Sequence, residues 1–140
     1  MAPAKPAPDP TALTAPYWDA AALGTLSAPW CEPCADWVYP PRPRCPRCGG
    51  SEMAWRTPAT TGEVVTFSVV HQAAYEAYRP DQPYVVAIIA IDGGPQLMTN
   101  LVDVPDVGAV AVGQRVELTF EPRGDGTQVP QFRPVPDLGI

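Results

Sequence analysis

The second half of the chain carries short runs of β-branched and aromatic residues, a pattern typical of strands. These runs occupy residues 62–72, 84–92, 95–104, 111–123 and 127–135. The clearest alternation lies between Val116 and Phe120, where apolar and polar side chains follow each other and so face opposite sides of a sheet. The Gly93-Gly94 pair, which separates two of the runs, predicts a tight turn.

No helical pattern between these runs is long enough to connect two parallel strands. Five short strands suit a small closed or nearly closed barrel, and the oligonucleotide/oligosaccharide-binding (OB) fold is the most common barrel of this size. The last run contains prolines, which cannot donate a hydrogen bond to a neighbouring strand, so we expect it at an edge. The sequence predicts a mainly β protein with an OB-fold barrel over residues 58–140.

The N-terminal part has a different pattern. Residues 1–16 alternate proline and alanine with little else, which predicts a flexible, extended arm. Residues 17–29 contain a run of alanines followed by Gly24 and Pro29, which predicts a short helix that ends before the proline. The cysteine-containing segment, residues 30–57, lies between this helix and the barrel.

All four cysteines lie in the stretch CEPCADWVYPPRPRCPRCGG, which starts at residue 31. Cys31 and Cys34 form one CxxC pair, and Cys45 and Cys48 form another. Each CxxC turn presents two sulfurs to one point, and two such turns complete a tetrahedral Zn(Cys)4 site. Gly49 lets the backbone turn tightly and direct its amides toward the sulfurs. We therefore predict a zinc ribbon over residues 30–57, with a structural zinc, because four thiolates leave no position open for water.

Three other interpretations of the cysteines are less favoured. A disulfide pair is disfavoured because we expect the protein in the reducing cytoplasm, for the reasons of length and apolar pattern given below. A redox-active CxxC would need a βαβ context that the chain lacks. An iron site with the same four ligands stays open, because metal choice depends on availability as much as on the ligand set.

Length and charge limit the function classes. A chain of 140 residues supports one main hydrophobic core, and its 20 prolines disfavour long helices. Residues 58–140 hold four arginines and ten acidic residues, so the barrel repels a phosphate backbone and we expect no nucleic-acid partner. No apolar run reaches the ~18–20 residues that span a bilayer, and the N-terminus lacks a signal-peptide pattern, so we expect a cytoplasmic protein with no membrane partner.

Residues for catalysis are few. The cysteines are assigned to the metal, His71 is the single histidine, and no nucleophile or phosphate-binding motif is present. The connector 72–83, QAAYEAYRPDQP, is longer than a hairpin needs and carries Tyr75, Tyr78 and Arg79. Together with His71 these are the candidate contacts for a partner or ligand, since long loops and tyrosines are common at interfaces. The alternative is a solvated loop whose tyrosines pack on the barrel.

The order of these motifs resembles the DUF35 family, a rubredoxin-like zinc ribbon followed by an OB-fold. The resemblance rests on the short helix, the CxxC and CPxCG pairs, the strand entry Thr61-Gly62-Glu63-Val64 and the Pro83-Tyr84 pair, and it covers about residues 17–135. It implies that Cys31, Cys34, Cys45 and Cys48 are metal ligands. It transfers no catalytic residue to this chain.

The resemblance also implies a partner. DUF35 proteins accompany thiolase-superfamily enzymes that act on acyl-CoA, among them aldolases that cleave the side-chain CoA thioesters of steroids. We therefore expect an accessory subunit that is not catalytic alone, in a lyase or thiolase complex whose substrate is an acyl-CoA. The alternative is a stand-alone OB-fold module that binds acyl-CoA or single-stranded nucleic acid. A third hypothesis is electron transfer through an iron tetrad.

Overall fold

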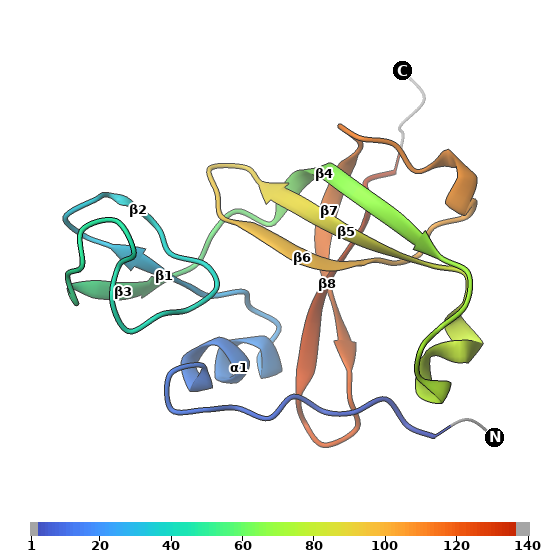
Figure 1. Ribbon diagram of the computed structural model, residues 1–140, viewed down its shortest axis with the longest axis horizontal. Helices are drawn as coiled ribbons and strands as arrows, with labels where there is room; N and C mark the ends of the chain where they lie inside the picture. Colours follow the sequence, from blue (N-terminus) through green and yellow to red (C-terminus); the bar gives the residue numbers. More distant parts are fainter. Residues whose placement is uncertain (1–2, 137–140) are drawn as a thin grey trace.

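The computed structural model describes residues 3–136. One helix, α1 (Ala15–Ala22), leads into a three-stranded sheet of β1 (Ala28–Cys31), β2 (Asp36–Trp37) and β3 (Met53–Arg56) (Figure 1). A closed barrel follows, built from β4 (Thr61–Val70), β5 (Tyr84–Ile91), β6 (Gln96–Leu101), β7 (Arg115–Pro122) and β8 (Gln128–Pro134). Short 3-10 turns, η1 (Glu76–Asp81) and η2 (Val107–Ala109), lie in two of the barrel connections. The predicted fold class is confirmed.

The barrel closes in the order β4-β5-β6-β8-β7, because β7 also pairs with β4. Its neighbouring strands are antiparallel except β6 and β8, which run parallel and pair at Leu101 and Phe132. The expectation that the last strand lies at an edge is wrong, since β8 lies between β6 and β7. A proline there keeps its acceptor even though it lacks a donor, and Pro130 O accepts a hydrogen bond from Thr99 Oγ1 at 3.0 Å.

The core fills the barrel through strict alternation along its strands. On β5, every second residue from Val85 to Ile91 is buried and the residues between them are half-buried. Phe132 of β8 is fully buried in the same cluster. Tyr17 of α1 also belongs to this cluster, so the helix packs against the barrel. Gln128 at the start of β8 strengthens that contact, because its Nε2 donates to Ala21 O at 3.0 Å.

The helix is shorter than the predicted range 17–29. It begins at Ala15 because Pro16 fits the first turn, where a backbone N–H has no partner within the helix. It ends at Ala22, and the chain has already entered β1 at Ala28. The predicted stop signal at Gly24 therefore lies just past the observed end of the helix.

The proline-rich arm, predicted to be flexible, lies along the barrel from residue 3 onward. Lys5 Nζ forms ion pairs with Asp81 of η1 and Glu121 of β7. Pro6 O accepts a hydrogen bond from Arg123 Nη1 at 3.0 Å. These contacts follow from charges far apart in sequence that no local pattern reveals. Residues 137–140, which the sequence assigned to the barrel, lie outside the described residues.

Trp37 joins the small sheet to the barrel. Its Nε1 donates to Gly93 O, in the turn between β5 and β6, at 2.8 Å. Its ring also packs edge-to-face on Trp30, with ring centroids 5.2 Å apart. Gly94 lies directly against this ring, because a Cβ built on Gly94 would stand 2.8 Å from Trp37 Cδ1.

The Gly93-Gly94 turn provides a matched test of this joint. Both glycines have positive φ, 80° and 83°, but only Gly94 contacts Trp37. We expect Gly94→Ala to destabilise the protein more than Gly93→Ala. Both substitutions carry a backbone cost of about 1–3 kcal/mol, and Gly94→Ala adds a clash that displaces Trp37. Urea denaturation, monitored by tryptophan fluorescence, measures the difference in unfolding free energy. Equal effects of the two variants would show that the packing of Trp37 does not depend on this turn.

Candidate functional site

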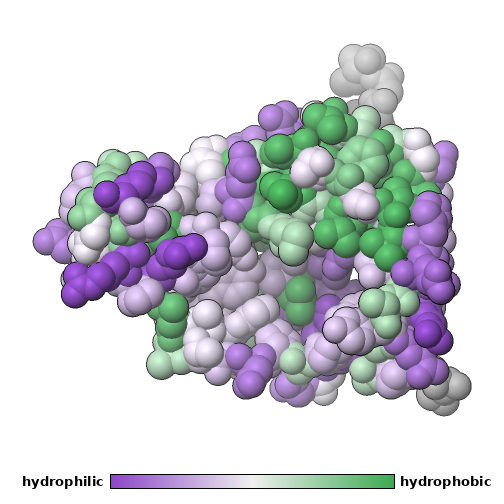
Figure 2. All heavy atoms as spheres, in the orientation of Figure 1, coloured by the Kyte–Doolittle hydropathy of each residue, from purple (hydrophilic) through white to green (hydrophobic). Residues whose placement is uncertain are grey.

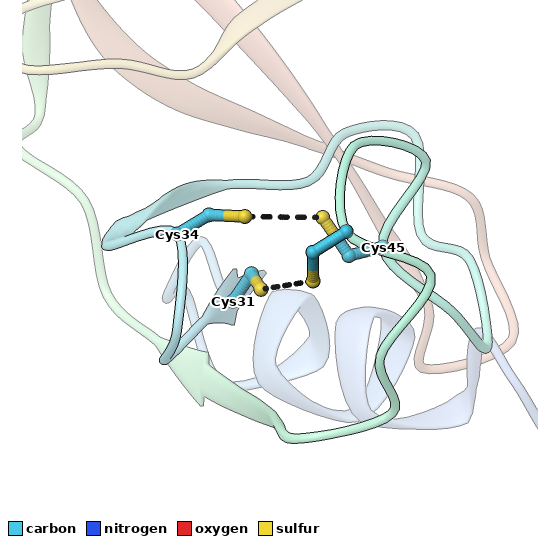
Figure 3. A group of neighbouring side chains, drawn as sticks. Cys31, Cys34 and Cys45 are labelled. Atoms are coloured by element: carbon cyan, nitrogen blue, oxygen red, sulfur yellow. Dashed lines mark hydrogen bonds between the residues drawn. The ribbon is translucent and has the colours of Figure 1, made fainter.

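The four cysteine sulfurs converge on one point between two turns of the chain. Cys31 Sγ lies 3.6 Å from Cys48 Sγ, and Cys34 Sγ lies 3.8 Å from Cys45 Sγ. The four sulfurs all lie within 4.8 Å of one another, and none is in a disulfide. Figure 3 shows the labelled side chains directing their sulfurs into the space between the turns.

This arrangement fits a tetrahedral thiolate site. With Zn–S bonds of about 2.3 Å, the sulfurs of a regular tetrahedron lie about 3.8 Å apart, close to the Cys31–Cys48 and Cys34–Cys45 separations. Zinc held by Cys31, Cys34, Cys45 and Cys48 would have a closed shell and would join the β1–β2 turn to the 45–50 turn. Such a site stabilises the fold and leaves no position for a substrate.

The backbone supports both turns in the same way. The residues that follow the second cysteine of each pair, Ala35 and Gly49, both have positive φ, 51° and 72°. Gly49 N–H donates to Cys45 O at 2.8 Å, and Gly50 N–H donates to Cys48 Sγ at 3.4 Å. Backbone amides of Cys48 and Arg47 lower the pKa of the Cys45 thiol to about 6, whereas burial and hydrogen bonds with the other sulfurs raise the pKa of the Cys31 thiol. Cys45 is therefore a thiol that readily forms the thiolate that a metal needs.

Arg47 is a supporting residue that the sequence did not single out. Its Nη2 donates to Trp37 O at 3.1 Å and lies 3.3 Å from an oxygen of Asp36. A hydrogen bond to the Cys34 sulfur raises the pKa of Arg47, so its positive charge offsets part of the negative charge of four thiolates. The only indication of this role in the sequence is its position between Cys45 and Cys48.

A second feature is a cavity of about 490 Å³ beside the barrel. Its aromatic lining comes from α1, the ribbon, the connector and β5, and we call it the aromatic groove: Tyr17, Trp18, Tyr39, Tyr75, Tyr78 and Tyr84. Tyr17 and Trp18 pack edge-to-face with ring centroids 4.8 Å apart. Figure 2 shows the surface hollowed between the barrel and the helix, with hydrophobic residues gathered over the barrel.

The structure separates the predicted contact residues into two groups. Tyr75 and Tyr78 line the aromatic groove, and Arg123 Nη1 donates to the Tyr78 hydroxyl at 3.1 Å. His71, just after β4, and Arg79, in η1, are exposed and are not part of the groove lining. Tyr17, Trp18 and Tyr39 were not among the predicted contacts, because they come from two separate segments, α1 and the ribbon, that meet the connector only in the fold.

Comparisons with known proteins agree with this architecture. Residues 18–54 match a family described as "ChsH2, rubredoxin-like zinc ribbon domain", and residues 55–121 match "ChsH2, C-terminal OB-fold domain". A solved structure titled "Ltp2-ChsH2(DUF35) aldolase" contains a chain 30% identical to this one, with a TM-score of 0.81 over 91% of this chain and 98% of that chain. The chain belongs to the DUF35 family. The resemblance seen in the motif order is thereby confirmed.

Curated relatives of this DUF35 chain carry two kinds of name. A "Probable enoyl-CoA hydratase alpha subunit" from Thermomonospora curvata is 33% identical over 119 residues, which cover 84% of this chain and 36% of the relative. A "DUF35 domain-containing scaffold protein" from Methanocaldococcus jannaschii is 33% identical over 91 residues, which cover 64% of this chain and 63% of the relative. The DUF35 chain thus spans about a third of the first protein and less than two thirds of the second. Within residues 3–136, no helix has the length and hydropathy needed to cross a bilayer.

Proposed function

We propose that this DUF35 chain is an accessory, non-catalytic subunit that docks on a thiolase-fold partner and supports its acyl-CoA chemistry. The reaction of the pair would be aldol or retro-aldol cleavage of a side-chain CoA thioester of the steroid type. The observation that carries the proposal is the match over 98% of a chain in the structure titled "Ltp2-ChsH2(DUF35) aldolase".

Two further observations support an accessory role. The archaeal relatives are named scaffold proteins, and the T. curvata relative is named as a subunit of a probable enoyl-CoA hydratase, whose substrate class is a CoA thioester. All four cysteines converge on one closed tetrad, so the thiols of this chain serve a structural site.

Affinity capture followed by an assay of the isolated components tests this function. We expect the tagged chain to recover a thiolase-fold protein from a lysate of its source in a fixed ratio, identified by mass spectrometry. We then expect a β-hydroxyacyl-CoA to be cleaved by the pair, and neither component alone to cleave it. Cleavage by the DUF35 chain alone would contradict the proposal. Recovery of the chain with single-stranded nucleic acid and no thiolase-fold protein would favour a stand-alone binding module.

A further inference from the structure

The aromatic groove has the dimensions of a ligand site. Its volume of about 490 Å³ falls within the range of about 300–1,000 Å³ that is typical of small-molecule pockets. Its walls come from the helix, the ribbon, the connector and the barrel, so the groove forms only when all these parts are in place. Sites of this kind are common where separate structural units meet.

The groove carries almost no free charge. Arg123 is the one charged residue in its lining, and its side chain is only 7% exposed. Arg123 Nε lies 3.2 Å from Glu121 Oε1, and Nη1 donates to the Tyr78 hydroxyl, so the positive charge of the guanidinium is already balanced by a carboxylate. The buried Nε itself has no hydrogen-bond partner among the described residues. Burial, and then the neighbouring Tyr39, raise the pKa of Tyr17, which keeps that phenol neutral.

This lining suits an apolar part of a ligand and does not suit a charged part. Phosphates need unpaired cations, and the groove offers none among its lining residues. Aromatic faces and a flexible methionine instead suit a bulky apolar group, since they remove its surface from water and adapt to its shape. Met98, 72% exposed on β6, and Tyr75, 73% exposed on the connector, lie where they can cover such a group.

We propose that the aromatic groove binds an uncharged, bulky apolar group of a small-molecule ligand. That this apolar group is the acyl part of the CoA thioester, and not its nucleotide, rests on the proposed function. Two polar groups would orient the ligand: the Tyr78 hydroxyl, fixed by Arg123, and the Asn100 side chain, whose Nδ2 donates to Val85 O at 3.1 Å. The volume of the groove, about 490 Å³, matches that of a small-molecule site, so a small molecule is its proposed occupant.

Methionine methyl groups report on this binding. Met98 lines the groove, whereas Met53 lies in β3 and packs against the cysteines, so it serves as an internal control. The full chain, labelled with 13C at the methionine methyls and saturated with zinc, is titrated with 1-adamantanol, a neutral bulky ring, and separately with free coenzyme A. We expect 1-adamantanol to shift the Met98 signal saturably and to leave Met53 unchanged, and coenzyme A to shift neither.

A pair of substitutions locates the site. Tyr75→Ala removes an exposed aromatic wall and should weaken binding of 1-adamantanol by about three- to tenfold. Val112→Ala removes a side chain of similar exposure, 68%, outside the groove lining and should leave the affinity unchanged. Because both side chains are exposed, both variants should keep the wild-type fold.

Several results would overturn the inference. They are the lack of any saturable Met98 shift, equal shifts of Met98 and Met53, a Met98 shift with coenzyme A as large as with 1-adamantanol, and an unchanged affinity of Tyr75→Ala. A Met98 signal that responds only to the thiolase-fold partner would assign the groove to a protein interface. The titration uses the chain alone, so a negative titration would not contradict the proposed complex with a thiolase-fold protein. If that complex did not form, ligand binding by the chain could still be measured.

Discussion

Cys45→Ser is expected to abolish stoichiometric metal binding and to unfold the ribbon while the barrel stays folded. The ribbon has very little core of its own: its buried cluster consists of Cys31, Val38 and Cys45. Its folding therefore depends on the metal, and structural zinc sites in small peptides contribute about 10–16 kcal/mol of apparent binding free energy at pH 7. The barrel has a separate cluster centred on residues such as Ile89 and Phe132, which the substitution does not touch.

Metal content and tryptophan fluorescence measure the two halves of this result. Elemental analysis should find one zinc per wild-type chain and a large loss in Cys45→Ser. The fluorescence of Trp30 and Trp37, in β1 and β2, should move toward that of solvated tryptophan. Arg42→Ser, an exposed change in the same loop, is the control and should keep the metal. A Cys45→Ser protein that keeps its zinc and its wild-type fluorescence would contradict the tetrad, and iron in place of zinc would identify the alternative metal.

Phe132→Ala is expected to cost about 3–5 kcal/mol of unfolding free energy. Phe132 is fully buried at the point where β8 meets β6, opposite Leu101, and where β8 meets β7, opposite Leu118. Removing its ring leaves a cavity at the closure of the barrel, which neighbouring strands cannot fill without breaking their pairing. The loss is a large part of the total unfolding free energy of such a domain, which is about 5–15 kcal/mol.

Urea denaturation at saturating zinc measures this cost, because constant metal occupancy keeps the ribbon contribution the same in both proteins. Val112→Ala, at a position 68% exposed, is the control and should change stability by less than about 0.5 kcal/mol. A Phe132→Ala variant that loses less than about 1 kcal/mol would contradict a barrel closed around this residue.

The strands were accessible to prediction because their signals are local. The alternation from Val116 to Phe120 depends on nearest neighbours, and the observed strand β7 contains all of it. The two CxxC pairs were equally clear, since each turn brings two sulfurs together within four residues. The edge position of the last strand was predicted wrongly. Its prolines show only that backbone donors are missing, and they do not show whether the barrel closes. The barrel closes on this side through the pairing of Leu101 with Phe132.

Spacing and alternation act over a few residues, so the four cysteines of the metal site, the mainly β class and the order of ribbon and barrel could all be predicted from the sequence. The aromatic groove and the Lys5 contacts with Asp81 and Glu121 became visible only in the folded chain. These features join segments far apart in the chain, and Tyr17 and Tyr39 meet at ring centroids 6.2 Å apart only after the helix and ribbon have packed on the barrel. Burial then gives Tyr17 its apolar surroundings, which no spacing of residues along the chain could have indicated.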